Sequence, residues 1–218
     1  MKWSLKITTG FIILFALLLG IASISRYFIF DPVIGNQIII EQGLEMFRME
    51  YKPWNYVLYL HILTASLALV IGPFQFLSQK KPRQLKTHRF LGKGYVLSII
   101  ISGFAGIYLS WFAFGGFLSK LGFLSLSISW LFSTYLAYSF IRKRNFNLHK
   151  EWMYRSYAIT FVAVTFRIWS AAIGYSLDHF AIGYVSAIWL GLIGNLIVIE
   201  IWIRKTRRKR SQLKSLSI

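Results

Sequence analysis

Six long apolar stretches constrain this sequence more than any other feature. A helix needs roughly 20 mainly apolar residues to cross a bilayer, and stretches of about this length cover residues 7–30, 54–77, 91–112, 121–141, 153–174 and 183–203. Hydrophobic residues make up 56% of the 218 residues and charged residues only 15%, whereas soluble domains carry about 25% charged residues. The sequence therefore predicts an all-α, polytopic transmembrane helical bundle with about six spans, in a single integral membrane domain over residues 1–218.

The charged residues give these spans a direction. If the N-terminus lies inside, 20 of the 25 Lys and Arg residues fall on the cytoplasmic side, and five of the seven acidic residues fall outside, namely Asp31, Glu41, Glu45, Glu50 and Asp178. Membrane proteins show this positive-inside bias, so we predict an N-in/C-in protein of the bacterial cytoplasmic (inner) membrane. A cleaved signal peptide explains the first stretch less well, because the apolar run continues to Phe30.

The net charge of +18 has an explanation in the membrane. The tail 204–218 begins with a run of Lys and Arg, and basic residues next to a span attract anionic lipid head groups. We therefore predict contacts with the lipid bilayer, with anionic lipids at the basic cytoplasmic loops, and no nucleic-acid partner. Membrane-protein partners or an oligomer are compatible with this interpretation.

The connection between the first two spans, residues 31–53, is long and mixes apolar with acidic side chains. Glu41 and Glu45 share a helical face because they are four residues apart. The segment is interpreted as an amphipathic helix on the outer membrane surface, with a partly ordered loop as the alternative.

The chain lacks the residues that several classes of enzyme need for catalysis. The chain has no Cys, which excludes disulfides and cysteine nucleophiles. It also has no phosphate-binding glycine loop, no zinc-protease histidine motif and no nucleophile elbow.

Polar residues within spans are costly and therefore functional candidates. His61 in the second span and Arg167 in the fifth each lie about seven residues from the outer end, roughly 10 Å deep. We predict that they form an outer polar pocket, with Gln75 further down on nearly the same face as His61. The alternative is that Arg167 extends to the outer head groups and His61 makes one structural hydrogen bond.

A second polar level is predicted near the cytoplasmic surface. His88 and His149 each begin an outward-going span, near the candidate N-cap residues Thr87 and Asn147. A helix N-terminus disfavours a protonated imidazole, and a neutral imidazole can ligate a metal. His179, in the last outer loop, is a weaker candidate because a loop histidine is usually solvated.

Several short motifs carry a family resemblance. They comprise His61, the run from Gly72 to Phe76, His88-Arg89 with Gly92 and Tyr95, Gly122-Phe123, the run from His149 to Tyr157, and Arg167. Over residues 54–167 the chain resembles bacterial predicted membrane proteins of the family called domain of unknown function 2306. The resemblance implies a membrane architecture and carries no activity.

A more distant likeness is to the di-haem cytochrome b superfamily, in which one helix often carries a histidine at each of two depths. Here Gln75 stands at the second position of the helix that carries His61, so the likeness leaves room for one haem b only. If the starts of their two helices converge, His88 and His149 would hold a single inner haem, and Arg89 or Arg155 would pair with the haem propionates.

Two classes of function follow from these candidates. The first is a small-molecule-binding, lipid-binding, transport or assembly component with polar sites at two membrane depths. The second is a haem b-binding or quinone-linked membrane redox protein that uses His88 and His149. An enzyme acting on lipid, with His61 as general base, is the third interpretation, but no acid or nucleophile is evident at its depth.

Overall fold

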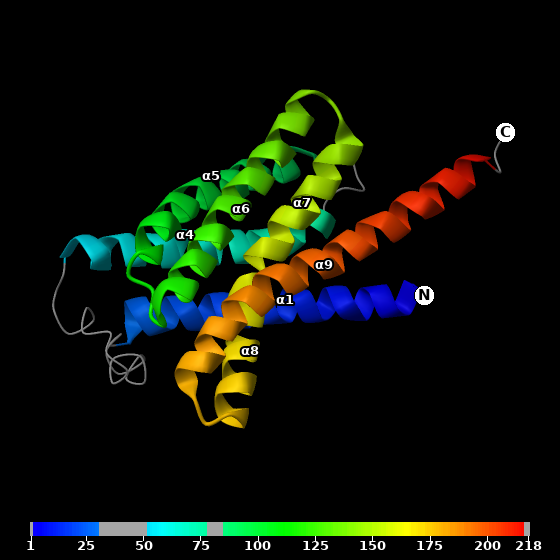
Figure 1. Cartoon of the computed structure of the whole chain (residues 1–218). Coiled ribbons are helices and arrows are strands. Elements are labelled where there is room, and N and C mark those ends of the chain that lie inside the picture. The colour runs from blue at the N-terminus through cyan, green and yellow to red at the C-terminus, as the bar shows by residue number, and fades with distance from the viewer. Residues whose placement is uncertain (1, 31–51, 78–84, 216–218) are drawn as a thin grey trace. The chain divides into compact units, whose positions relative to one another are not determined.

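The computed structural model describes residues 2–30, 52–77 and 85–215, and every regular element in them is a helix. In chain order these are α1 (Lys2–Ile24) with a π-helical end (η1, Ser25–Ile29), α4 (Lys52–Leu77), α5 (Leu85–Ser110), α6 (Gly116–Arg142), α7 (Phe146–Thr160), α8 (Val162–Ser176) and α9 (Phe180–Ser215) (Figure 1). A helix satisfies its backbone polar groups within the segment, as a chain in lipid requires.

The prediction of six spans is confirmed. Helices long and apolar enough to cross a membrane cover Gly10–Ile29, Pro53–Phe76, Leu85–Ser110, Gly116–Arg142, Phe146–Ser176 and Phe180–Arg208. Large apolar side chains such as Leu97, Phe104 and Val198 are exposed, as expected for surfaces that face lipid. The N-in/C-in direction stays a prediction, and the predicted outer helix falls almost entirely on residues 31–51, outside the described residues.

Two helices begin earlier than predicted. α5 begins at Leu85 and α7 at Phe146, so His88 and His149 are each the fourth residue of a helix. The N-cap predictions for Thr87 and Asn147 were wrong. Asn145 caps α7, because its side chain accepts a hydrogen bond from the Leu148 amide at 3.2 Å, and Thr87 lies inside the first turn of α5.

The chain divides into two compact units, Met1–Leu131 and Phe132–Ile218, with the boundary inside α6. In the first unit, α1 packs against α4 and α4 against α5. Glycines allow close approach here: a Cβ at Gly20 would lie 2.8 Å from Val70, and one at Gly103 would lie 2.6 Å from Leu131 of α6.

In the second unit, α7 and α8 form the fifth span and α9 forms the sixth. The two helices of the fifth span meet at Phe161, whose amide donates to the Tyr157 carbonyl at 2.8 Å. A short turn then reverses the chain from α8 into α9 (Figure 1). α8 and α9 approach closely next to this turn, because a Cβ at Gly183 would lie 2.6 Å from the Gly174 nitrogen and 2.7 Å from the Ser170 oxygen.

Candidate functional site

His61 lies at a junction of three helices in the first unit. Its Nδ1 is 2.9 Å from the carbonyl oxygen of Ser102 and 2.9 Å from the Ser102 hydroxyl, and Ser102 is fully buried on α5. A Cβ at Gly106 would lie 3.4 Å from the imidazole Cε1 and 2.6 Å from Oγ of Ser127 on α6. The absent side chain of Gly106 therefore leaves space for both groups.

The contact with Ser102 selects the tautomer of His61. A carbonyl oxygen only accepts, so Nδ1 carries the proton and donates it, while the Ser102 hydroxyl donates to the His61 carbonyl at 3.3 Å. His149 repeats this arrangement in the second unit, where its Nδ1 lies 2.8 Å from the Ala137 carbonyl. In the neutral form, both histidines keep their lone pair on Nε2.

Gln75, near the end of α4, and His88, near the start of α5, are in contact in the first unit. The backbone groups around Gln75 fix its amide orientation: the nitrogen donates to the His88 carbonyl at 3.1 Å, and the oxygen accepts from the Gly92 amide at 3.2 Å. The same nitrogen donates to His88 Nδ1 at 2.8 Å. His88 therefore carries its proton on Nε2, the reverse of His61 and His149.

The two predicted residue pairs stay predictions, because His61 and His88 belong to the first unit and Arg167 and His149 to the second. Arg167 is exposed on α8, and its Nη1 donates to the Ala163 carbonyl at 2.7 Å. The guanidinium thus reaches back toward the start of α8. The outer pocket and the alternative extension to the outer head groups both stay predictions.

Two further candidates have simple local surroundings. His179 accepts a hydrogen bond from the Ile182 amide at 3.4 Å in the first turn of α9. This is the local role of a helix-capping residue. Arg89 is exposed on α5.

Polar bridges connect the fifth and sixth spans at successive levels of the second unit. At the first level, between the start of α7 and the C-terminal part of α9, Nε and Nη2 of Arg207 donate to the buried carboxylate of Glu151, with Nε at 2.7 Å from Oε1. One level further in, Arg155 donates to Glu200 Oε2 from Nη2 at 2.7 Å and from Nε at 3.1 Å. Deeper still, the Asn195 amide donates to the Ala158 carbonyl at 3.0 Å.

The sequence interpretation included Arg155 and missed its partner, as it missed Glu151 and Arg207. A signal for them exists in the acidic residues. Glu151 and Glu200 are the two of seven that do not fall in the predicted outer segments. A carboxylate in a span or beside one is usually paired with a cation, so both residues indicate an arginine on a neighbouring helix.

An apolar groove of about 330 Å³ lies beside the Arg155–Glu200 pair, lined by Arg155, Ile193, Leu196, Ile197 and Glu200. Its apolar residues follow one face of α9 at spacings of three and four, and Glu200 continues that face. Arg155 is oriented by Trp152, whose ring centroid lies 4.6 Å from Cζ of the guanidinium. A cation held by two neighbouring side chains therefore stands at one end of an open apolar groove.

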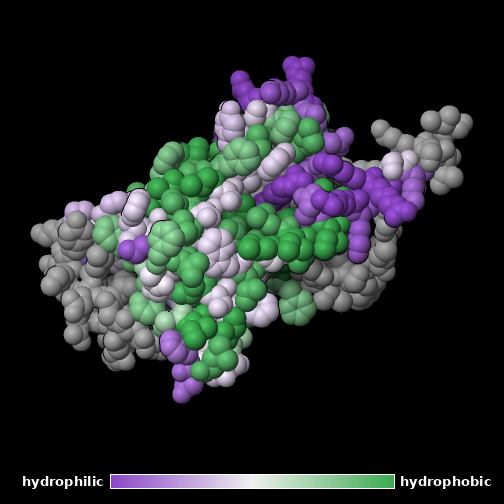
Figure 2. All heavy atoms as spheres, viewed as in Figure 1, coloured by the Kyte–Doolittle hydropathy of each residue, from purple (hydrophilic) through white to green (hydrophobic). Residues whose placement is uncertain are grey.

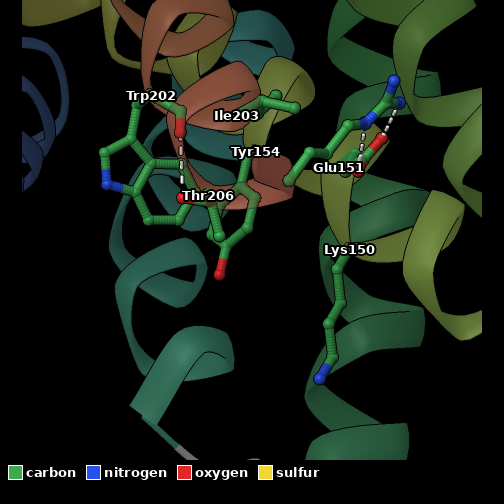
Figure 3. Close-up of a pocket in the computed structure, with 7 residues that line it drawn as sticks. Lys150, Glu151, Tyr154, Trp202, Ile203 and Thr206 are labelled. Carbon is green, nitrogen blue, oxygen red and sulfur yellow. Dashed lines mark hydrogen bonds and ion pairs between the residues drawn. The ribbon is translucent and has the colours of Figure 1, made fainter. Parts of the chain in front are cut away.

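Figure 2 shows hydrophilic residues gathered at the α6–α7 turn and over the last turns of α9. A second cavity lies there, lined by residues that include Glu151, Tyr154 and Trp202 (Figure 3). Its volume of about 10 Å³ is at the limit for one water molecule. This cavity therefore has no space for a ligand.

The described residues do not favour the predicted haem site. The absence from them of any group of three or more His, Cys, Asp or Glu side chains that could hold a metal ion does not bear on haem, because haem iron needs only one or two axial ligands from the protein. The states of the two histidines do bear on it. Metal-ligating histidines usually donate one ring N–H to an oxygen and bind through the other nitrogen. His149 meets this condition and His88 does not, because the Gln75 amide places the His88 proton on Nε2.

Comparison with known families identifies the family to which this chain belongs. The model of the family described as "Predicted membrane protein (DUF2306)" matches residues 58–203, which is most of the chain. The chain belongs to this family. The resemblance found in the sequence is therefore confirmed, and in the DUF2306 match it extends through the sixth span. Searches of curated proteins and of solved structures each found no match. Membership in DUF2306 describes a membrane protein and names no activity, so function has to be argued from the sites above.

Proposed function

We propose that this protein binds a lipid or another amphiphilic small molecule in the groove beside α7 and α9. One observation carries the proposal: the Arg155–Glu200 ion pair stands at the end of an apolar groove of about 330 Å³. Small-molecule sites typically have volumes of about 300–1,000 Å³, with mainly apolar walls and a few polar groups that fix orientation. The groove fits this description at its lower end.

The groove suits an amphiphile because its two ends differ. Ile193, Leu196 and Ile197 offer an apolar wall for a hydrocarbon chain, while Arg155 and Glu200 offer charged partners for a polar head. Arg155 and Glu200 lie just inside the predicted spans 153–174 and 183–203, and charged residues within spans often mark ligand and transport sites.

A purely structural role for the ion pair is the main alternative. Glu151 and Arg207 already connect the same two helices one level nearer the start of α7. The Arg155–Glu200 pair is thus one of two ion pairs between α7 and α9 in the described residues, and it is the one beside the groove. We therefore assign the Arg155–Glu200 pair a role in ligand binding in addition to any structural role.

A transport or assembly role is compatible with such a site, since the bound amphiphile would be either the cargo or a lipid partner. Haem b or quinone chemistry through His88 and His149 is less well supported, because the contact from Gln75 places the His88 proton on Nε2.

The experiment is to block the groove and identify what is lost. The full chain and two variants are purified in mild detergent, and their organic extracts are compared by mass spectrometry per mole of protein. Ile197→Trp fills the groove, and Val198→Trp is the matched control, because Val198 is the next residue, is 69% exposed and does not line the groove.

We expect the wild type and Val198→Trp to carry a lipid-soluble molecule that Ile197→Trp has lost. Equal extracts from all three folded proteins would contradict the proposed function.

A further inference from the structure

Glu200 occupies the position of a bound anion at the head of the groove. Its Oε2 accepts from Arg155, and its Oε1 accepts from Nε of Arg204 at 3.4 Å. Each carboxylate oxygen therefore has a guanidinium partner. The three side chains together carry one net positive charge.

We propose that the ligand is an anionic phospholipid, and that its head-group phosphate replaces the Glu200 carboxylate on Arg155. This inference rests on the proposed function and names the ligand class of the same groove. The guanidinium fork binds phosphate with the same paired geometry that it uses for a carboxylate.

The burial of the three side chains decides which one moves. The Arg155 side chain is only 16% exposed, whereas Glu200 is 35% and Arg204 is 77% exposed. Arg155 also keeps its contact with Trp152 when Glu200 leaves. The cation is therefore the fixed part of the site, and the carboxylate is the part that a phosphate can displace.

The net charge favours an anion over a neutral or cationic head. A phosphate that displaces Glu200 leaves the carboxylate beside Arg204, so each anion keeps a guanidinium. A neutral head group cannot form an ion pair with Arg155 in place of Glu200. An ammonium group would be repelled by the positive charges of Arg155 and Arg204. Charge complementarity thus selects a phosphate-bearing amphiphile.

The groove also has the direction that a phospholipid of the cytoplasmic leaflet needs. The apolar residues Ile193, Leu196 and Ile197 lie on the outer side of Glu200 along α9 in the predicted orientation. A phosphate at Arg155 would therefore place its acyl chain along the groove toward the membrane centre. A free phosphate ion would leave this apolar wall unused.

The test is native mass spectrometry of the full chain in detergent, titrated with dioleoyl phosphatidylglycerol. Dioleoyl phosphatidylcholine has the same acyl chains without net charge and provides the comparison. Inorganic phosphate is added as a competitor in a separate series. The variants are Arg155→Gln, Glu200→Gln and Ile197→Trp. Lys120→Gln is the charge-matched control, because Lys120 is an exposed lysine of α6 outside the basic segments.

We expect the phosphatidylglycerol affinity to fall about tenfold or more in Arg155→Gln, the factor expected when a charged hydrogen-bond partner is lost. Glu200→Gln removes the internal competitor, so we expect affinity to rise about fivefold, as the energy of an exposed ion pair allows. Lys120→Gln should change it less than twofold. The rise in Glu200→Gln tests the proposal even if Arg155→Gln fails to fold.

Other outcomes separate the head-group proposal from the proposed function. One such outcome is that both lipids bind equally, that Ile197→Trp loses the binding, and that Glu200→Gln has no effect. This outcome would overturn the proposal of an anionic head group and leave the groove as a site for amphiphiles. Competition by inorganic phosphate at equal concentration would overturn the lipid as the source of the phosphate. Lipid binding unaffected by Ile197→Trp, or a dimer lost in that variant, would overturn both.

Discussion

The Nδ1 atom of His61 lies 2.9 Å from the carbonyl oxygen of Ser102 on the neighbouring helix. This contact makes Nδ1 the protonated nitrogen and connects two spans through one side chain. The Gln75 amide imposes the opposite tautomer on His88. In their neutral forms, the two histidines of the first unit therefore have opposite tautomers, with the free lone pair on Nε2 of His61 and the proton on Nε2 of His88.

The tautomers can be measured directly. In the protein labelled with nitrogen-15 at histidine, we expect neutral His61 and His149 to show a proton on Nδ1, and neutral His88 to show it on Nε2. Gln75→Leu removes the amide that donates to His88, so only the His88 signal should change. An Nδ1–H signal from His88 in the unsubstituted protein would contradict the assigned contact.

Gly106 is expected to tolerate no side chain. A Cβ there would lie 2.6 Å from the Ser127 hydroxyl and 3.4 Å from the His61 ring, and overpacking of this kind costs about 1–3 kcal/mol. We expect Gly106→Ala to lose that much free energy of unfolding in an SDS titration from mixed micelles. Adding Ser127→Ala, which removes the closest atom, should restore part of the loss.

Gly94→Ala is the control on the same helix, because its Cβ would meet only Ile71 at 3.8 Å. An equal loss in both alanine variants would show that the cost comes from something other than the His61 junction.

The Glu151–Arg207 pair is expected to stabilise the second unit more than the exposed Arg204–Glu200 contact does. Glu151 is buried, so Arg207→Ala leaves a carboxylate without its main partner, at a cost of about 1–3 kcal/mol. Arg204→Ala removes an exposed pair, worth about 0–1 kcal/mol. The same SDS titration compares them, and Arg207→Ala combined with Glu151→Gln should lose less than Arg207→Ala alone. A larger loss in Arg204→Ala would reverse the ranking of the two pairs.

The spans could be predicted because bilayer thickness dictates their length and apolar character. The starts of α5 and α7 were harder to predict, since an apolar run ends at the first charged residues while the helix continues through them. Leu85 to Phe90 and Phe146 to Glu151 are helical despite their Lys, Arg and His residues.

The partners of the polar residues were the least predictable part. His61 stood out because a histidine within a span is unusual, but its partner Ser102 is one of many serines in apolar helices. Which serine lies opposite depends on the rotation and crossing of two helices, and a one-helix pattern does not contain that information. The lone acidic residues Glu151 and Glu200 carried a stronger signal, because a carboxylate in a span or beside one is usually paired with a cation.

The direction of the chain in the membrane is a prediction on which the leaflet of the proposed lipid depends. Reporter fusions at Glu45 and after Ile218 measure it. We expect a periplasm-active reporter to work at Glu45 only, and a cytoplasm-active reporter to work after Ile218 only. An outward-facing C-terminus would overturn the N-in/C-in arrangement and move the groove head to the other leaflet.

A side chain added where α8 and α9 approach closely is expected to cause the largest loss of stability among these glycine variants. A Cβ at Gly183 would meet backbone atoms, the Gly174 nitrogen at 2.6 Å and the Ser170 oxygen at 2.7 Å. Backbone atoms of a packed helix cannot turn aside as a side chain does, so the two helices would have to separate. We expect Gly183→Ala to cost at least about 2 kcal/mol in SDS unfolding, in the upper part of the range for overpacking. Gly194→Ala, on the same helix with nothing within 4 Å of its Cβ, should be neutral or slightly stabilising. If Gly183→Ala is as stable as Gly194→Ala, the glycine contact does not determine how the fifth and sixth spans pack.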